Sequence, residues 1–319
     1  MTLRAGLSLL SPAGRNARLQ IFIWHRVLQD PDPMIPGEMH AAMFAQILKW
    51  LRRWFNVLPL EAAVAQLAAG TLPARAAAIT FDDGYADNLT VAAPLLRSAG
   101  LPATFFVASG YLDGGRMWND GLIEAVRRSP LDVLDTTQWG RFELNGPAQR
   151  GSVALQLIDK IKYLEPAARE AAVAEVARAA GSTLPTDLMM TSRQVAELHR
   201  QGFTIGAHTV SHPILARISL SAAADEIANG RAALEQITGA PVTLFAYPNG
   251  KPGRDYLAEH VALVRKQGFA AAVSTAWGAS GPGADVFQLR RFSPWDTTRL
   301  RYGLRLARNL LRPEGEPLV

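Results

Sequence analysis

The sequence predicts an α/β fold in which a mostly parallel sheet is surrounded by helices. Short apolar runs alternate with stretches of helical periodicity along most of the 319 residues, a pattern typical of βα units. The composition agrees, because 49% hydrophobic and 19% charged residues fit a globular chain with a large core. The residues with catalytic chemistry follow the carboxyl ends of predicted strands, which is where α/β enzymes place their sites.

Seven strands are expected from the apolar runs. They cover residues 19–24, 77–81, 103–107, 203–207, 242–246, 270–274 and 288–292. Between the first two strands, an apolar stripe from Met43 to Leu51 recurs at helical spacing and predicts a helix. One stretch, residues 112–191, interrupts the alternation. It is mostly helical in pattern, and we expect it to be an insertion.

Two adjacent carboxylates and two histidines lie at the ends of predicted strands. Asp82 and Asp83 end the second strand, where the turn at Gly84 lets both side chains converge on one cavity. His208 and His212 follow the fourth strand, and their spacing puts both rings on one face of a helical turn. Two imidazoles and one carboxylate leave open positions on a divalent cation, and a second carboxylate can take a proton from water. These residues predict a hydrolytic metal site, although each motif alone is also typical of an ordinary turn or a surface pair.

The motifs also carry a resemblance to a known family. Thr80 to Gly84 and His208 to His212 resemble the first two signature motifs of the polysaccharide deacetylase family, also called NodB-like or carbohydrate esterase family four. The likeness extends to residues 102–107, 245–250 and 268–271 and runs in order from Ile21 to Phe292. It implies an irregular (β/α)7 barrel with the helical insertion over the barrel mouth. It also implies removal of acetyl groups from a carbohydrate, with N-acetyl favoured over O-acetyl.

The resemblance assigns roles to individual residues. Asp82 would be the general base, and the Tyr247 backbone N–H would face the developing oxyanion. Pro248 and Gly250 would shape the loop that meets the substrate. The metal ligands would be Asp83, His208 and His212. Zinc is the first choice for the cation, and cobalt, manganese and iron suit the same ligand set.

The sequence departs from the family pattern in two motifs. The third motif normally supplies an Arg that orients the catalytic Asp, and this chain has none there. The late motif normally supplies an acidic His, whereas this chain has Leu289-Arg290-Arg291, and an Arg cannot donate a proton at useful pH. We therefore expect His25, after the first strand, to be the acid, as in a branch of the family with circularly permuted motifs. Arg291 would then hold Asp82. The alternative is that His25 is a core histidine and Arg291 a surface charge.

The predicted organisation is one deacetylase domain with short flanking segments. An N-terminal extension covers residues 1–18, the domain covers 19–296 with the insertion at 112–191, and a basic tail covers 297–319. Trp118 opens the insertion and is a candidate to stack on a sugar ring, with simple packing as the equal alternative. The acetylated carbohydrate is the expected partner. Nucleic-acid binding has no motif support, and the oligomeric state is not determined by the sequence.

The net charge of +5 is concentrated near the end of the chain. No acidic residue occurs between 297 and 312, and the segment contains Arg299, Arg301, Arg305, Arg308 and Arg312. Such a segment could contact an anionic membrane, and a solvated helix face is the alternative. No apolar run reaches the ~18 residues of a membrane span, and the first residues make a poor signal peptide. We therefore expect a protein that is cytoplasmic or peripheral to the inner membrane face.

Two other functions remain open from the sequence. The same fold could serve a hydrolase of a small, non-sugar C–N substrate. The altered late motif would also fit an inactive carbohydrate-binding protein, but the intact Asp82 and the complete set of metal ligands argue against this reading. The absence of cysteine excludes disulfides, thiolate nucleophiles and cysteine-ligated zinc.

Overall fold

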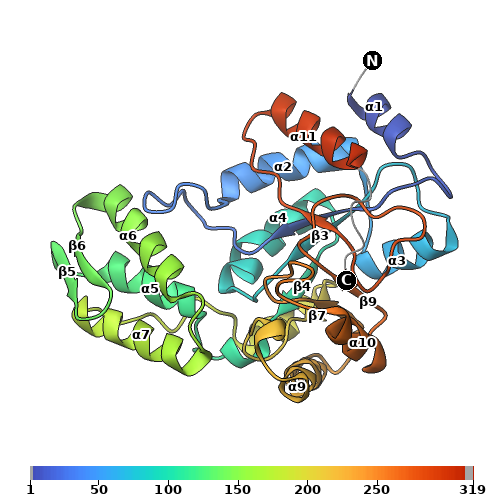
Figure 1. Ribbon diagram of the computed structural model, residues 1–319. Coiled ribbons are helices and arrows are strands. Elements are labelled where there is room, and N and C mark those ends of the chain that lie inside the picture. Colours follow the sequence, from blue (N-terminus) through green and yellow to red (C-terminus); the bar gives the residue numbers. More distant parts are fainter. Residues whose placement is uncertain (1–2, 313–318) are drawn as a thin grey trace.

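Seven parallel strands curl into a nearly closed barrel in the computed structural model, which describes residues 3–312 and residue 319 (Figure 1). The strands are β1 (Gln20–Trp24), β3 (Ala76–Phe81), β4 (Thr104–Val107), β7 (Thr204–Ala207), β8 (Leu244–Ala246), β9 (Ala271–Val273) and β10 (Arg291–Phe292). A two-residue strand, β2 (Asn56–Val57), pairs with β3 beside this path. Each barrel strand overlaps a segment expected from the sequence. The prediction of an irregular (β/α)7 barrel is confirmed.

The first and last strands of the barrel, β1 and β10, are neighbours in the sheet. The order is β10-β1-β3-β4-β7-β8-β9, so the last strand pairs with the first, and Ile21 lies opposite Arg291. The ring closes beyond β9, where Val273 bridges to Leu289, two residues before β10. The carboxyl ends of β1 and β10 are therefore neighbours, and Arg291 lies inside the barrel at the level of Ile21, four residues before His25.

Side-chain alternation separates two apolar layers. Inward-facing residues such as Ile21, Ala78 and Phe106 form one buried cluster with helix α3 (Leu60–Ala69). Outward-facing residues such as Phe22 and Ile79 form a larger cluster under the surrounding helices. Because strand residues two apart share a face, this division fixes which polar side chains at the strand ends point into the barrel.

Helices cover the outside of the barrel. They are α2 (Ala41–Trp54), α4 (Ala93–Ala99), α8 (Ser192–Arg200), α9 (Leu220–Thr238) and α10 (Ala258–Lys266). The apolar stripe predicted in the first crossover is the buried face of α2, which includes Phe44, Ile47 and Leu51. Two of these helices begin at residues of a type that favours the N-cap position. Thr191 caps α8 in a capping box, and Ser219 accepts the N–H of Ala222 at the start of α9.

The predicted insertion forms a lobe beside the barrel, which we call the helical lobe. It contains α5 (Trp118–Arg128), α6 (Gly146–Ile161) and α7 (Pro166–Ala179), with an apolar cluster of its own (Figure 1). It also contains an antiparallel hairpin of β5 (Val133–Thr136) and β6 (Gly140–Glu143), which the sequence pattern did not predict. The hairpin was missed because each strand has only four residues, which is too short for a clear period-two signal.

The segments that flank the barrel are also helical. Helix α1 (Leu3–Leu10) packs against α2 and against α11 (Arg299–Leu311). The arginine-rich segment of the predicted tail is therefore a docked helix, with Tyr302, Leu306 and Leu310 buried. Residues 1–2 of the predicted extension and 313–318 of the predicted tail lie outside the described residues. None of the described helices is both long and apolar enough to cross a bilayer.

Candidate metal centre and active site

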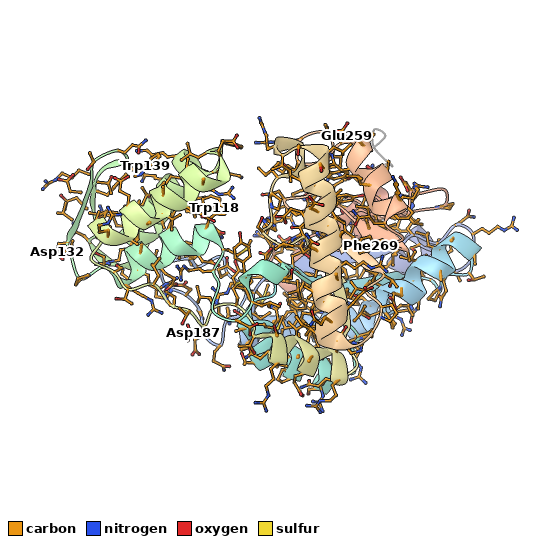
Figure 2. All side chains as sticks on the ribbon, turned by 90° about the horizontal axis from the view of Figure 1, so that it is seen from below. Trp118, Asp132, Trp139, Asp187, Glu259 and Phe269 are labelled. Atoms are coloured by element: carbon orange, nitrogen blue, oxygen red, sulfur yellow. The ribbon has the colours of Figure 1, made fainter. Side chains whose placement is uncertain are left out.

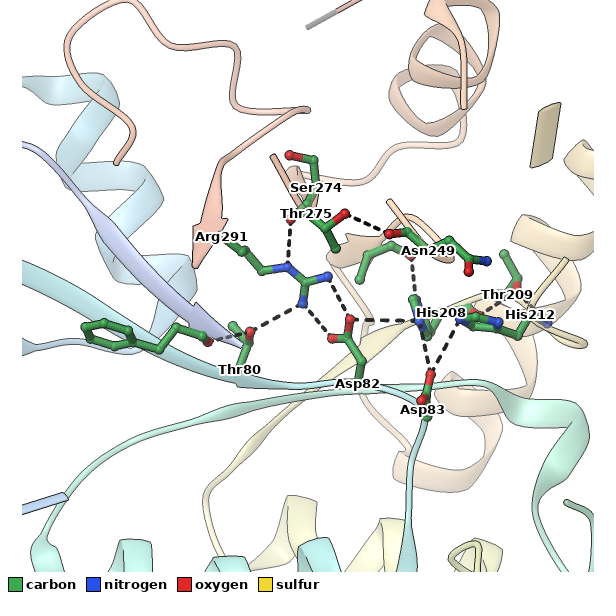
Figure 3. A network of polar contacts seen from close by, with 12 residues as sticks. Thr80, Asp82, Asp83, His208, Thr209, His212, Asn249, Ser274, Thr275 and Arg291 are labelled. Carbon is green, nitrogen blue, oxygen red and sulfur yellow. Dashed lines mark hydrogen bonds and ion pairs between the residues drawn. The ribbon is translucent and has the colours of Figure 1, made fainter. Parts of the chain in front are cut away.

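Three potential metal ligands converge at the carboxyl ends of two barrel strands (Figure 3). Asp83 follows β3, and His208 and His212 follow β7. Their ligand atoms lie within 4.8 Å of one another. Asp83 Oδ1 is 3.4 Å from His208 Nε2 and 3.5 Å from His212 Nε2. The structure therefore brings together the three residues that the sequence proposed as ligands.

The backbone that holds the two histidines differs from the expected helical turn. Residues 208–212 form an irregular loop, in which Thr209 and His212 have φ angles of 65° and 52°. The Thr209 hydroxyl accepts the N–H of His212 at 3.1 Å and closes the turn. The rings meet through this turn, with centroids 4.7 Å apart. Non-glycine residues adopt such positive φ angles at a cost of about 1–3 kcal/mol each, which is common at functional sites.

The spacing of these atoms fits one shared cation. Two ligands at about 2.0–2.1 Å from a tetrahedral zinc ion are about 3.3 Å apart, close to the separations between Asp83 and the two imidazoles. Asp83 Oδ1 is buried and accepts no hydrogen bond from any described residue. The Nδ1 atom of His208 lies 2.7 Å from the Ala246 carbonyl oxygen, which can only accept a proton. His208 therefore carries its proton on Nδ1 and presents the Nε2 lone pair to the centre.

The electrostatics of the triad also suit a cation. Burial favours the neutral form of Asp83, but the two histidines outweigh burial and lower its pKa. Burial likewise opposes protonation of His208, yet the nearby carboxylates raise its pKa. Burial lowers the pKa of His212 to about 4. A carboxylate that stays ionised and an imidazole that stays neutral are the forms that bind metal, and a cation would displace the proton that His208 tends to hold.

Asp82 makes a two-point ion pair with Arg291. The guanidinium donates to both carboxylate oxygens, at 2.6 and 2.7 Å, and its Nε donates to the Ser274 carbonyl at 2.9 Å (Figure 3). Arg291 is fully buried, so it is not the surface charge of the alternative reading. Burial would raise the pKa of Asp82, but the charge of Arg291 lowers it below its ordinary value. The contact expected from the sequence is present, and Asp82 is held ionised 3.9 Å from His208 Nε2.

His25 lies in the wall of the pocket that contains the metal triad. It is exposed there, so it is not a core histidine. The backbone around it is fixed by two residues at the start of the helical segment that follows β3. Asn88 donates to the His25 carbonyl at 2.9 Å, and Asp87 accepts from the Val27 N–H at 3.0 Å. Both residues lie just beyond the first motif, Thr80 to Gly84, and no role was predicted for them.

The oxyanion donor predicted from the sequence is wrong. The Tyr247 N–H donates to the Val273 carbonyl at 3.2 Å, as part of the pairing between β8 and β9. Its ring is buried, and the hydroxyl donates to the Phe287 carbonyl at 3.0 Å. Pro248 has no N–H, and the next donor along the loop belongs to Asn249. No described residue accepts that N–H, and Asn249 lines the pocket. The N–H in this loop that has no described acceptor is therefore that of Asn249, two residues after Tyr247.

Pro248 and Gly250 are buried and shape this loop without being exposed to the pocket. Gly250 has a φ angle of 74°, and a Cβ atom there would approach the Thr275 N and the Tyr247 carbonyl oxygen to 3.0 Å. Only glycine fits this left-handed position without strain. The Thr275 hydroxyl donates to the Asn249 carbonyl at 2.7 Å, which further fixes the loop. The two residues act on the site through the position of Asn249.

Trp118 lies on the helical lobe, on the side nearer the barrel (Figure 2). It lines the same pocket, which extends between the lobe and the barrel with a volume of about 1220 Å³. The Arg169 guanidinium lies over the indole, 5.0 Å from its centroid. The structure therefore brings Trp118 to the pocket, with the Arg169 guanidinium over one face of its ring.

The pocket also contains carboxylates that the sequence reading missed. Asp120 is nearly fully buried, and its Oδ2 has no hydrogen-bond partner among the described residues. Burial raises the pKa of Asp120 to about 7. Glu38 lies in the same wall, and burial raises its pKa as well. The one signal for Asp120 in the sequence is its place two residues after Trp118, at the start of the insertion.

A family model and a curated relative match this chain. The family model described as polysaccharide deacetylase matches residues 69–138 and 162–272, more than half of the chain. The polysaccharide deacetylase homologue YxkH of Bacillus subtilis (strain 168) is 20% identical over 279 residues, covering 87% of this chain and 71% of YxkH. His25 and Arg291 both lie outside the segments that match the family model.

Two solved structures show the same fold at low sequence identity. The deacetylase PplD of Streptococcus pyogenes, solved in complex with acetate, has a TM-score of 0.61 at 17% identity and covers 92% of this chain and 98% of its own. IcaB from Ammonifex degensii has a TM-score of 0.61 at 20% identity, with coverages of 95% and 99%. The arrangement of nearly the whole chain is therefore shared with these proteins.

Proposed function

Because this chain belongs to the polysaccharide deacetylase family, we propose that it is a metal-dependent hydrolase that removes acetyl groups, chiefly N-acetyl, from a polysaccharide, oligosaccharide or glycoconjugate. The observation that carries the proposal is the triad of Asp83, His208 and His212 next to an ionised Asp82. Zinc is the first choice for the cation, with cobalt, manganese and iron as alternatives. The cation would polarise the acetyl carbonyl and lower the pKa of a water molecule.

The residues around the centre have distinct roles in this proposal. Asp82 accepts the proton of the attacking water, since each of its oxygens keeps a lone pair beyond the bond to Arg291. The Asn249 N–H is positioned to stabilise the negative charge that develops on the acetyl oxygen. His25 donates a proton to the nitrogen as the C–N bond breaks, because an amine leaves readily only when protonated. The products are acetate and a free amine.

The size of the pocket supports a carbohydrate larger than one sugar. Its volume of about 1220 Å³ exceeds the ~300–1,000 Å³ of sites for small ligands. This favours an oligosaccharide over the small C–N substrate left open by the sequence. The ionised Asp82 and the three convergent ligands likewise favour a working enzyme over an inactive binding protein.

Acetate release from chitooligosaccharides, with and without a chelator, tests the proposal. We expect release that the chelator abolishes and that added zinc, cobalt or manganese restores. Asp83→Ala and His208→Ala should lose metal, because an open three-ligand site has no ligand to spare. Asp82→Asn should keep metal and lose activity about 100-fold or more. Full metal occupancy in both ligand variants would refute the metal assignment, and oligosaccharide binding without acetate release would indicate a binding protein.

A further inference from the structure

Three helices on one side of the barrel contain no acidic residue. They are α1, α2 and α11, which come from distant parts of the sequence. Their eight basic residues are Arg4, Lys49, Arg52, Arg53, Arg299, Arg301, Arg305 and Arg308. All of these side chains except Arg305 are exposed, and Arg305 pairs with Asp296. The sequence drew attention to residues 299–312 alone, whereas the fold extends the positive charge over two more helices.

The three helices form one continuous surface, which we call the basic face. Helix α1 packs against both α2 and α11, and the three lie together above the barrel in Figure 1. Aromatic contacts join α2 to α11. The rings of Trp50 and Tyr302 are 5.2 Å apart, and the Arg299 guanidinium lies 5.9 Å from the centroid of Trp54. The positive charges therefore have fixed positions relative to one another.

Large apolar side chains are exposed on the same helices. Leu9 of α1 is 73% exposed, and Leu300, Leu304 and Leu311 of α11 are 72%, 57% and 63% exposed. A purely solvated helix face would carry polar residues at these positions. Exposed leucines interleaved with arginines are instead typical of helices that lie in a membrane interface, where arginines reach headgroups and leucines enter the acyl boundary.

The basic face begins at the rim of the pocket. Met39, His40 and Met43, at the start of α2, line the pocket, and so do residues 294–297, just before α11. A surface held by the basic face would therefore lie next to the pocket mouth. A glycan emerging at that surface could enter the pocket without a separate diffusion step.

We propose that the face formed by α1, α2 and α11 docks on an anionic lipid bilayer. The attraction comes from three helices that carry no acidic residue and on which only Arg305 pairs with an acid that the structure describes, Asp296. The exposed leucines add apolar burial that a soluble polyanion cannot supply. The proposal goes beyond the deacetylase activity and does not depend on it. It also differs from a membrane span, since it requires only a peripheral contact.

Co-sedimentation of the full chain with vesicles tests the docking. We expect binding to vesicles of phosphatidylcholine with about one third phosphatidylglycerol, and little binding to phosphatidylcholine alone. Each basic residue near such a surface is worth about 1 kcal/mol, so Arg301→Gln with Arg308→Gln should weaken binding about 30-fold. The matched control is Arg193→Gln with Arg217→Gln, two exposed arginines outside the basic face, which should change affinity less than about 3-fold.

Leucine variants separate a bilayer from a soluble polyanion. Leu304→Ser should weaken vesicle binding several-fold, whereas Leu155→Ser, at a position of the helical lobe that is 56% exposed, should not. Equal binding to neutral vesicles, or an equal loss in the two arginine pairs, would overturn the proposal. If Leu304→Ser binds like wild type and heparin displaces the vesicles completely, the partner is a soluble polyanion. Acetate release from soluble chitooligosaccharides gives a separate readout, so a failed vesicle assay leaves the proposed function untouched.

Discussion

Arg291 has two opposite effects on the carboxylate of Asp82. It orients both oxygens through a planar, two-point contact, and it lowers the pKa of the group that would accept a proton in the proposed reaction. A lower pKa makes a weaker base, so the benefit of the pair lies in orientation and in keeping Asp82 ionised while buried. Removal of Arg291 would leave a buried, unpaired charge, which costs about 3–5 kcal/mol in comparable cases.

His25 and Arg291 are predicted to affect different steps. His25→Ala should keep metal and fold but lose about 100-fold or more on an N-acetyl substrate, and lose less on an activated ester whose leaving group needs no proton. Arg291→Ala should impair both substrates alike, because water activation precedes both. Steady-state rates on the two substrates, with metal content measured in parallel, check this expectation.

The control for this comparison is His40→Ala, a histidine in the same pocket wall but away from the strand ends. It should change the rate only a few-fold on either substrate. Equal loss on amide and ester in His25→Ala, together with loss of metal, would show that His25 is a ligand or a structural residue.

The sequence predicted the site residues that act through their side chains. It was less successful for the residue that would act through its backbone N–H. Residue types at the strand ends predicted that Asp82, Asp83, His208 and His212 would converge, which the structure shows, and the family resemblance supplied the proposed division into ligands and base. The contact between Arg291 and Asp82 was predicted from the departures from the family pattern. Tyr247 was wrong as the oxyanion donor, because a free N–H depends on where strand pairing stops. Its N–H is used by Val273, a partner far away in the sequence.

At the scale of elements, helix α9 supports the loop that carries the two histidines. Gly230 of α9 faces this loop, and a Cβ atom there would lie 2.7 Å from the backbone carbon of Thr209. Glu226 of the same helix accepts the N–H groups of Val210 and Ser211 at 2.9 and 2.8 Å. Helix α9 therefore fixes the position of residues 209–211, through close packing at Gly230 and hydrogen bonds to Glu226.

Gly230→Ala is predicted to weaken metal binding. In an unconstrained helix this change would stabilise by about 1 kcal/mol, but here the methyl group must push the Thr209 backbone away from α9. We expect at least a tenfold weaker zinc affinity, measured by competition with a chromophoric chelator. Ala228→Gly, at an exposed position of the same helix, should cost stability without changing zinc affinity. An unchanged affinity in Gly230→Ala would show that the loop tolerates the shift.

The sequence predicted the barrel strands better than the lobe. Most barrel strands are apolar on both faces because helices cover the outside and side chains fill the inside, so the runs stand out. The lobe hairpin, by contrast, has a partly exposed register in which Arg141 faces Asp135. Neither the hairpin nor the pocket between lobe and barrel has a local sequence signal, since both arise from tertiary packing.

At the scale of the whole molecule, the apolar cluster of the lobe and those of the barrel are separated by a pocket with buried charge. Asp120 belongs to the lobe and lies near Arg26 and Tyr85 of the barrel. Its folded pKa of about 7 lies above the unfolded value of about 3.9. The folded protein therefore binds the proton more tightly, and stability falls as the pH rises from about 4 through 7.

Asp120→Asn is predicted to remove this pH dependence. Between pH 5 and 7.5 the wild type should lose about 2–3 kcal/mol more unfolding free energy than the variant, since each pKa unit corresponds to about 1.4 kcal/mol. Urea unfolding at the two pH values measures the difference. Asp132→Asn, at an exposed carboxylate of the same lobe, is the control and should follow the wild type. A constant gap between wild type and Asp120→Asn would contradict the shifted pKa.

The place of β10 in the barrel has a consequence for biosynthesis. Asp82 and the three proposed ligands are all translated before residue 213, but the guanidinium that neutralises Asp82 arrives with residue 291. Until that strand docks beside β1, the nascent chain must keep the Asp82 carboxylate protonated or in water, because a lone buried charge is too costly. A nascent chain that lacks residue 291 therefore cannot form the buried ion pair with Asp82. The proposed active site is complete only after β10 has been synthesised and has paired with β1.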